Sequence, residues 1–130
     1  MAVDALTVSD IERLCDSRIF ARGRDYFLSG AVVERVRFEG GIAARVLGAR
    51  SYRVEVRSGL HFRCTCPFDL GGACKHVVAT LLAWKERPES FVEEDPITRA
   101  IARLTKREIA AILREVADRY PEIVAQYRIR

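Results

Sequence analysis

Long apolar stretches are missing from this sequence of 130 residues. No run approaches the roughly 18 to 20 residues that a membrane-spanning helix needs, so we expect no membrane contact. The first ten residues contain neither a basic patch nor a long apolar segment, which argues against a secretory leader. The two glycine-rich patterns that cradle phosphates, the Walker loop and the dinucleotide fingerprint, are also missing. We therefore expect a protein of the cell interior that takes no small-molecule substrate.

Lysine and cysteine are both scarce. Only three of the 22 basic residues are lysine, and the others are arginine, whose planar guanidinium suits bidentate phosphate recognition. The net charge of +4 is compatible with a polyanionic partner, although a general compositional bias toward arginine is an equal explanation. Four cysteines are too few for a disulfide scaffold, and with 49% hydrophobic residues the chain can build a core without one.

The placement of the cysteines is more informative than their number. Cys64, Cys66, Cys74 and His76 form the pattern Cys-x-Cys, seven intervening residues, and Cys-x-His. Three thiolates and one imidazole complete a tetrahedral zinc shell. The alternatives are a disulfide arrangement or a chance grouping of packed side chains. An iron–sulfur cluster is disfavoured because it prefers four thiolates or a different spacing.

The local sequence predicts that the four side chains converge. Residues 60–66 alternate apolar and polar side chains, as a strand does, so Cys64 and Cys66 would point to the same face. Pro67 and two glycines end this strand and turn the chain. The helix expected next would present Cys74 and His76 in its first turn, where the positive end of the helix dipole favours a thiolate. Four ligands close the zinc shell, so we expect one structural Zn2+ and no catalysis.

This motif resembles the SWIM zinc finger, a family found in chromatin-remodelling ATPases and Mutator-type transposases. The resemblance covers about residues 50–85, and residues 20–32 resemble the helix that precedes the finger in small prokaryotic members. It implies a strand–strand–helix module with the two Cys-x-Cys residues and the Cys-x-His pair as zinc ligands. Because family members act as DNA-binding or protein-interaction modules, it also implies a place in nucleic-acid metabolism.

Capping and turn signals outside the finger predict an α+β fold. A first helix is expected from a capping box at residues 9–12, with Cys15 as a small core residue on the same face as Ile11 and Leu14. A second helix is expected at about residues 17–29, ended by Gly30. An antiparallel four-stranded meander then leads into the strand–turn–helix finger, with strands at about 31–38, 42–47, 51–57 and 60–66.

The length favours one domain, followed here by a linker and a C-terminal helical segment. Residues 1–87 would hold the N-terminal helices, the meander and the finger. Residues 88–95 are acidic and contain Pro88, which predicts a linker. Residues 96–130 would form a helical segment, because Asp95-Pro96 and a capping box at residues 105–108 are both signals for the start of a helix.

The meander is also predicted to have one basic face. Even-numbered positions are apolar apart from Glu34, whereas odd-numbered positions are rich in arginine. Arginines on a sheet face can follow a phosphate backbone without reading sequence, and an ordinary solvated face is the alternative. The residues expected to contact nucleic acid are Arg35, Arg37, Arg45, Arg53, Arg57 and Arg63 on this face, and Lys75 between two zinc ligands. Aromatic rings are not expected on this face.

Two functions are compatible with these features. The first is a zinc module that binds nucleic acid, DNA rather than RNA, without catalysis. The second is a protein-interaction adaptor in a DNA repair, recombination or remodelling complex, with a remodelling ATPase or a recombinase as the partner protein. We expect the protein to be cytoplasmic, at the nucleoid in a prokaryote or in the nucleus of a eukaryote.

Overall fold

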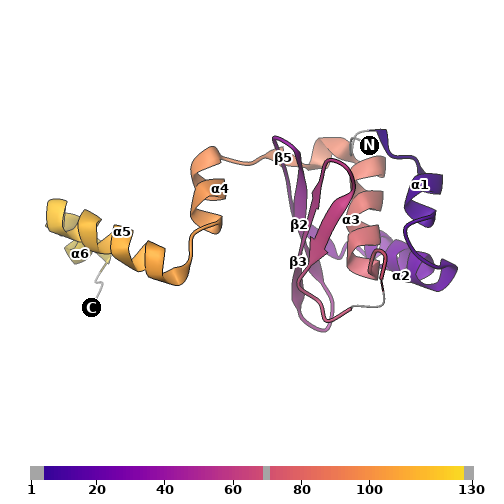
Figure 1. Cartoon of the computed structure of the whole chain (residues 1–130), viewed down its shortest axis with the longest axis horizontal. Coiled ribbons are helices and arrows are strands. Elements are labelled where there is room, and N and C mark those ends of the chain that lie inside the picture. Colours follow the sequence, from indigo (N-terminus) through magenta and orange to yellow (C-terminus); the bar gives the residue numbers. More distant parts are fainter. Residues whose placement is uncertain (1–4, 69–70, 128–130) are drawn as a thin grey trace. The chain divides into compact units, whose positions relative to one another are not determined.

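The computed structural model describes residues 5–68 and 71–127 of the chain. The chain divides into two compact units, residues 1–93 and 94–130. In the first unit, one face of a β-sheet is covered by helices, which lie together on one side of the strands in Figure 1. The second unit is helical. The predicted α+β class is therefore confirmed.

Two helices open the first unit. Helix α1 (Val8–Glu12) begins at Thr7, whose hydroxyl accepts a hydrogen bond from the Asp10 amide while the Asp10 carboxylate accepts one from the Thr7 amide. The capping box thus lies two residues before the one predicted at Ser9. Helix α2 (Ser17–Leu28) is capped by Asp16, and the chain turns away at Gly30, where φ is +79°. This left-handed conformation suits glycine, so the predicted end of α2 is confirmed.

The sheet has five strands in the order β4-β3-β2-β1-β5. Strands β1 to β4 are the predicted antiparallel meander, with bounds Val32–Phe38, Gly41–Leu47, Ser51–Arg57 and His61–Cys64. The fourth strand ends at Cys64, two residues earlier than the alternation of residues 60–66 suggested. Strand β5 (Val92–Glu93) pairs in parallel with β1 and was not predicted.

Helix α3 (Lys75–Glu86) forms the centre of the core. Every residue from His76 to Ala83 is buried, because the sheet covers one side of the helix and α1 and α2 cover the other. Such all-round burial is why α3 lacks an amphipathic pattern. Gly23 of α2 lies directly against Val78, and a Cβ at this position would clash with the valine side chain. Glycine therefore allows α2 to approach α3 closely, beside the first turn that holds His76.

Strand β1 contains a β-bulge that the sequence did not predict. Its pairing with β2 shifts between Val33 and Val36, and Glu34 has a φ of 50°. A bulge adds one residue to one strand, so the in–out alternation reverses beyond it. Phe38 accordingly lies opposite Gly41 and beneath the Arg57 guanidinium, 6.0 Å from its ring centroid, on the face of the sheet away from α3.

Because of this bulge, two arginines lie on the opposite side of the sheet from the one predicted. Arg37 lies opposite Ile42, a core residue, and therefore on the helix-covered side at the strand end. Arg35 also turns to that side: its Nε donates to the Val32 carbonyl, and its Nη1 donates to Ser90 at 2.8 Å. Neither arginine belongs to the basic face on which the alternation placed it.

The segment expected to be an acidic linker belongs largely to the first unit. It forms a 3-10 helix, η2 (Pro88–Ser90), and strand β5. Between these elements Phe91 is only 2% exposed and packs edge-on against Trp84, with ring centroids 5.1 Å apart. Arg35 covers the other side of Phe91, with its guanidinium 5.9 Å from the ring centroid. One aromatic side chain thus anchors a segment whose other residues are mostly charged.

The second unit consists of α4 (Pro96–Ala102), α5 (Lys106–Arg119) and α6 (Pro121–Tyr127). Asp95 caps α4 with proline in its first turn, and Thr105 and Glu108 form a capping box at α5, so both predicted helix starts are confirmed. No residue within these three helices is buried. Among all described helices, none has the length and apolar character needed to cross a membrane.

Candidate zinc centre and basic surfaces

Two structural elements bring the four predicted zinc ligands together. Cys64 is the last residue of β4, and Cys66 follows just beyond it. Thr65 keeps this segment aligned with β3, since its amide donates to the Arg53 carbonyl and its hydroxyl accepts from the Arg53 amide. Cys74 is the N-cap of α3, and His76 is the second residue of that helix. The strand end and the helix start therefore each supply two ligands.

The ligand atoms have the spacing of a tetrahedral zinc shell. All four lie within 4.8 Å of one another. The Nδ1 atom of His76 is 3.7 Å from the Cys64 sulfur and 3.9 Å from the Cys74 sulfur. With ordinary zinc–sulfur and zinc–nitrogen bond lengths, a tetrahedral site has a sulfur–nitrogen separation of about 3.6 Å. The residues fit one zinc ion without rearrangement of the backbone.

Aromatic rings hold the His76 imidazole in place. Tyr52 of β3 stacks on it, with centroids 4.3 Å apart and ring planes at 26°, and Tyr26 of α2 approaches edge-on at 5.4 Å. The buried Nε2 atom has no hydrogen-bond partner among the described residues. Zinc-bound histidines usually donate this second N–H to a carboxylate or a carbonyl. Here ring packing orients the imidazole so that Nδ1 points at the sulfurs.

The last residues of the loop between the ligand pairs, residues 71–73, contact the segment between α1 and α2. Gly71 and Gly72 have φ values of +84° and +71°, which confirms the predicted turn. A Cβ on Gly72 would lie 2.5 Å from the Leu14 carbonyl oxygen, and that same oxygen accepts a hydrogen bond from the Ala73 amide at 2.9 Å. The segment after α1 therefore fixes the position at which α3 begins.

The surroundings of the sulfurs favour a thiolate at Cys74. A hydrogen bond from the Cys64 thiol, then hydrogen bonds from His76 and the Val77 amide, lower the pKa of Cys74 although burial opposes this change. The same thiol–thiolate hydrogen bond raises the pKa of Cys64, because that thiol keeps the shared proton. An exposed amide at a helix N-terminus is a general means of stabilising a thiolate ligand.

Residues 52–85 match the family model of the SWIM zinc finger. This segment is a SWIM zinc finger. It runs from β3 through α3, in agreement with the predicted limits of about 50–85, and its four ligands provide for one structural zinc. No curated protein and no solved structure matches the chain.

Cys15 lies outside the SWIM finger, as expected. It is half-buried at the edge of the core, with its sulfur 4.0 Å from the Ile11 carbonyl oxygen. Burial raises the pKa of its thiol, and the neighbouring Asp16 and Glu12 carboxylates act in the same direction. A thiol with these surroundings is a packing group, which agrees with the role predicted from the sequence.

Four of the predicted arginines do share the sheet face away from α3. Arg45 lies directly opposite Arg53 in the β2–β3 pair, and Arg63 lies opposite Glu55 in the β3–β4 pair. Arg57 is on the same face, because it follows the fully buried Val56. We call Arg45, Arg53, Arg57 and Arg63 the arginine face. Phe38 also lies on this face, under the Arg57 guanidinium, although no aromatic ring was expected there. The charged Glu34 at an otherwise apolar position was the one signal in the sequence for the bulge that moves Phe38 to this face.

Lys75 lies apart from the arginine face. It is the first residue of α3, and its ammonium nitrogen is 5.2 Å from the centroid of the Tyr26 ring. Tyr26 belongs to α2, on the helix-covered side of the sheet. The seven residues predicted to contact nucleic acid are therefore distributed over three places: the arginine face, the strand end near Phe91 and the start of α3.

Proposed function

We propose that this protein is a non-enzymatic nucleic-acid-binding module, with DNA as its main ligand, and that the arginine face makes the contact. The observation that supports the proposal is the position of four arginines on three adjacent strands, all on one side of the sheet. Arginines spaced in this way can contact successive phosphates. The SWIM finger serves as the scaffold, because its four protein ligands leave the zinc no open position for catalysis.

The acidic residues near the arginine face leave it positive. Glu34 pairs with Arg45 at 3.1 Å, and Glu55 pairs with Arg57 at 3.0 Å. Both arginine side chains are half exposed, and solvent-exposed pairs contribute only about 0–1 kcal/mol, so a phosphate can replace the carboxylate. Within the described part of the chain, Arg53 and Arg63 make no side-chain ion pair.

Fluorescence anisotropy of the zinc-loaded protein with duplex DNA, single-stranded DNA and RNA at several salt concentrations tests this proposal. Four phosphate contacts on duplex DNA predict a slope of about −3.6 for log affinity against log salt. The double variant Arg53→Glu/Arg57→Glu should lose most of the binding. Its control, Arg107→Glu/Arg114→Glu, changes the charge equally on exposed residues of α5. Equal losses in the two variants would refute the arginine face as the contact.

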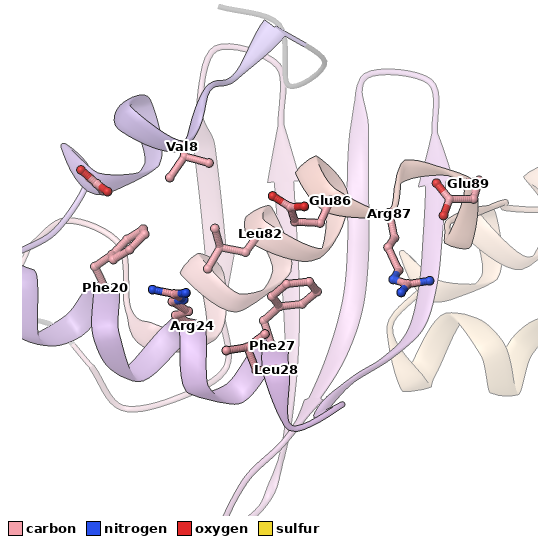
Figure 2. A pocket seen from close by; sticks show the side chains of 10 residues that line it. Val8, Phe20, Arg24, Phe27, Leu28, Leu82, Glu86, Arg87 and Glu89 are labelled. Carbon is pink, nitrogen blue, oxygen red and sulfur yellow. The ribbon is translucent and has the colours of Figure 1, made fainter.

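A second function, that of a protein-interaction adaptor in a DNA-processing complex, is favoured by the apolar side chains of the second unit. Ile97, Ile101, Ile112 and Leu113 are 47–68% exposed. In the first unit, a hollow of about 820 Å3 lies between α1, α2 and α3, and Figure 2 shows that both apolar side chains, such as Phe27 and Leu82, and charged side chains, such as Arg24, line it. Apolar side chains that lie together on a surface, as Ile97 and Ile101 do four residues apart on α4, are typical of surfaces that bind other proteins.

Co-purification with a remodelling ATPase or a recombinase tests the adaptor function. The variant Ile112→Asp/Leu113→Asp should lose the partner, while its zinc content stays at one per chain because these residues lie outside the finger. A complex that survives deletion of residues 96–130 would contradict docking through the C-terminal helices.

A further inference from the structure

A cleft beside the zinc centre combines positive charge with aromatic walls. It has a volume of about 660 Å3, and three elements of the first unit surround it. Helix α2 contributes Arg18 and Arg22, and strand β3 contributes Tyr52. The finger contributes Phe68, Lys75 and three of the zinc ligands, Cys66, Cys74 and His76, so the zinc centre forms one wall of the cleft. The cleft lies on the helix-covered side of the sheet, because Tyr52 packs on His76 there while the next residue, Arg53, belongs to the arginine face.

The charges around the cleft do not cancel. Arg18 and Arg22 are four residues apart in α2 and so project from the same side of the helix. Among the described residues of the lining, Asp16 is the single carboxylate, and it already accepts a hydrogen bond from the Ile19 amide as the cap of α2. None of the three cations forms an ion pair within the part of the chain that the structure describes. The zinc centre, with three thiolates around Zn2+, adds a net charge of about −1 to this wall. Three cations still outweigh this centre and one occupied carboxylate, so the cleft favours an anionic ligand.

The aromatic walls indicate what kind of anion fits. One side of the Tyr52 ring is stacked on His76, and the ring also lines the cleft. Phe68 lines it as well, from the loop that follows Cys66. Aromatic side chains next to cations are the common means by which proteins hold unpaired bases and their phosphates. A small inorganic anion would leave both rings unused.

We propose that this cleft binds one nucleotide of a single-stranded nucleic acid. The phosphate lies between Arg18, Arg22 and Lys75, and the base lies against Tyr52 and Phe68. The volume is within the range of about 300–1,000 Å3 that is typical of small-ligand sites. Bases inside a duplex are stacked and paired and cannot enter, so the cleft selects unpaired strands. This second site depends on the proposed function only for the general class of ligand, and its position is independent of the arginine face.

Titration of the zinc-loaded full chain with a 5′-phosphorylated thymidine dinucleotide, followed by NMR, tests the site. The dinucleotide is too short to occupy both surfaces. We expect amide shifts at the start of α2, at Phe68 and at Lys75. Arg22→Glu should weaken binding at least about tenfold, as expected for loss of a charged hydrogen bond. Its control is Arg24→Glu, an equal charge change in the same helix on a residue that lines the hollow of Figure 2 instead.

Two further titrations distinguish the phosphate contact from the base contact. One uses inorganic phosphate as the ligand, and the other uses the variant Phe68→Leu. The leucine variant should weaken dinucleotide binding about tenfold, in the range for loss of one stacked base, and leave phosphate binding unchanged. Phosphate binding as tight as that of the dinucleotide would overturn the nucleotide assignment. Shifts confined to residues 53–63 would overturn the cleft but support the arginine face. Shifts in the cleft, with DNA affinity unaffected by Arg53→Glu/Arg57→Glu, would support the cleft and refute the face.

Discussion

Removal of zinc should unfold the first unit while leaving the second largely intact. Structural zinc contributes about 10–16 kcal/mol in finger peptides, whereas a whole domain is typically stable by about 5–15 kcal/mol. The ligands Cys74 and His76 lie at the start of α3, which contacts both N-terminal helices and four strands of the sheet. Loss of the metal therefore affects the element around which the core of this unit is built, and the remaining contacts are too weak to compensate.

The helix lengths give the size of the expected change. Helices α1, α2 and α3 have 5, 12 and 12 residues, and α4, α5 and α6 have 7, 14 and 7. The two units thus hold nearly equal shares of helix, so the helical circular dichroism signal should fall by about half on chelation. Trp84, the single tryptophan, lies in α3 against Phe91 and should become exposed to water in the same transition.

Ligand variants provide the matched test. Cys66→Ser removes one sulfur from the shell and should lower both zinc content and the midpoint of urea unfolding, measured by Trp84 fluorescence. Cys15→Ser removes the cysteine outside the shell and should keep one zinc per chain. Acid should also release the metal, because ligand thiolates become protonated as the pH falls. A metal-free chain with the same urea midpoint as the loaded chain would refute this reasoning.

Three further predictions follow from single side chains. Phe91→Ala should destabilise the first unit by about 3–5 kcal/mol in urea unfolding, since it leaves a cavity in the core; no change would mean that its segment is a linker after all. Thr105→Ala should reduce the helicity of α5, measured by NMR, at a cost of about 1 kcal/mol. The Thr105 amide, which donates to the partner carboxylate of Glu108, lowers the pKa of that carboxyl below its usual value of 4.5. The capping box should therefore be fully present above pH 4.5 and be lost as the pH falls from there through the lowered pKa. Helicity of α5 that does not change with pH would contradict this role. Tyr52→Ala should weaken zinc binding about tenfold in competition with a chelator, because the ring orients His76, and unchanged affinity would exclude this role.

The zinc ligands could be predicted because all the necessary information is local. The four residues lie within thirteen positions, and the strand end, the glycine turn and the helix start each have their own signal in the sequence. The orientation of His76 could not be predicted in the same way. Tyr26 and Tyr52 come from two other elements, and only the packing of α2 and β3 against α3 brings their rings to the imidazole.

The predictions that were wrong concern places where a single residue interrupts a regular pattern in the sequence. The bulge at Glu34 reverses the alternation of β1, so Arg35 and Arg37 leave the predicted face and Phe38 joins it. Alternation alone cannot detect an inserted residue, although a charged residue at an apolar position was a sign of one. Phe91 was overlooked for a similar reason: it is a single buried ring within an acidic segment, and its partner Trp84 lies in α3.

Strand β3 connects the two proposed binding surfaces through the zinc centre. Tyr52 points toward His76 and the cleft, whereas Arg53 points to the opposite side of the sheet. The Arg53 backbone also holds Thr65, which lies between the ligands Cys64 and Cys66. Zinc therefore holds the strand that contributes Tyr52 to the cleft and Arg53 to the arginine face, even though no phosphate or base needs to touch the metal. A structural metal in this position would therefore support both proposed surfaces at once, although they lie on opposite sides of the sheet.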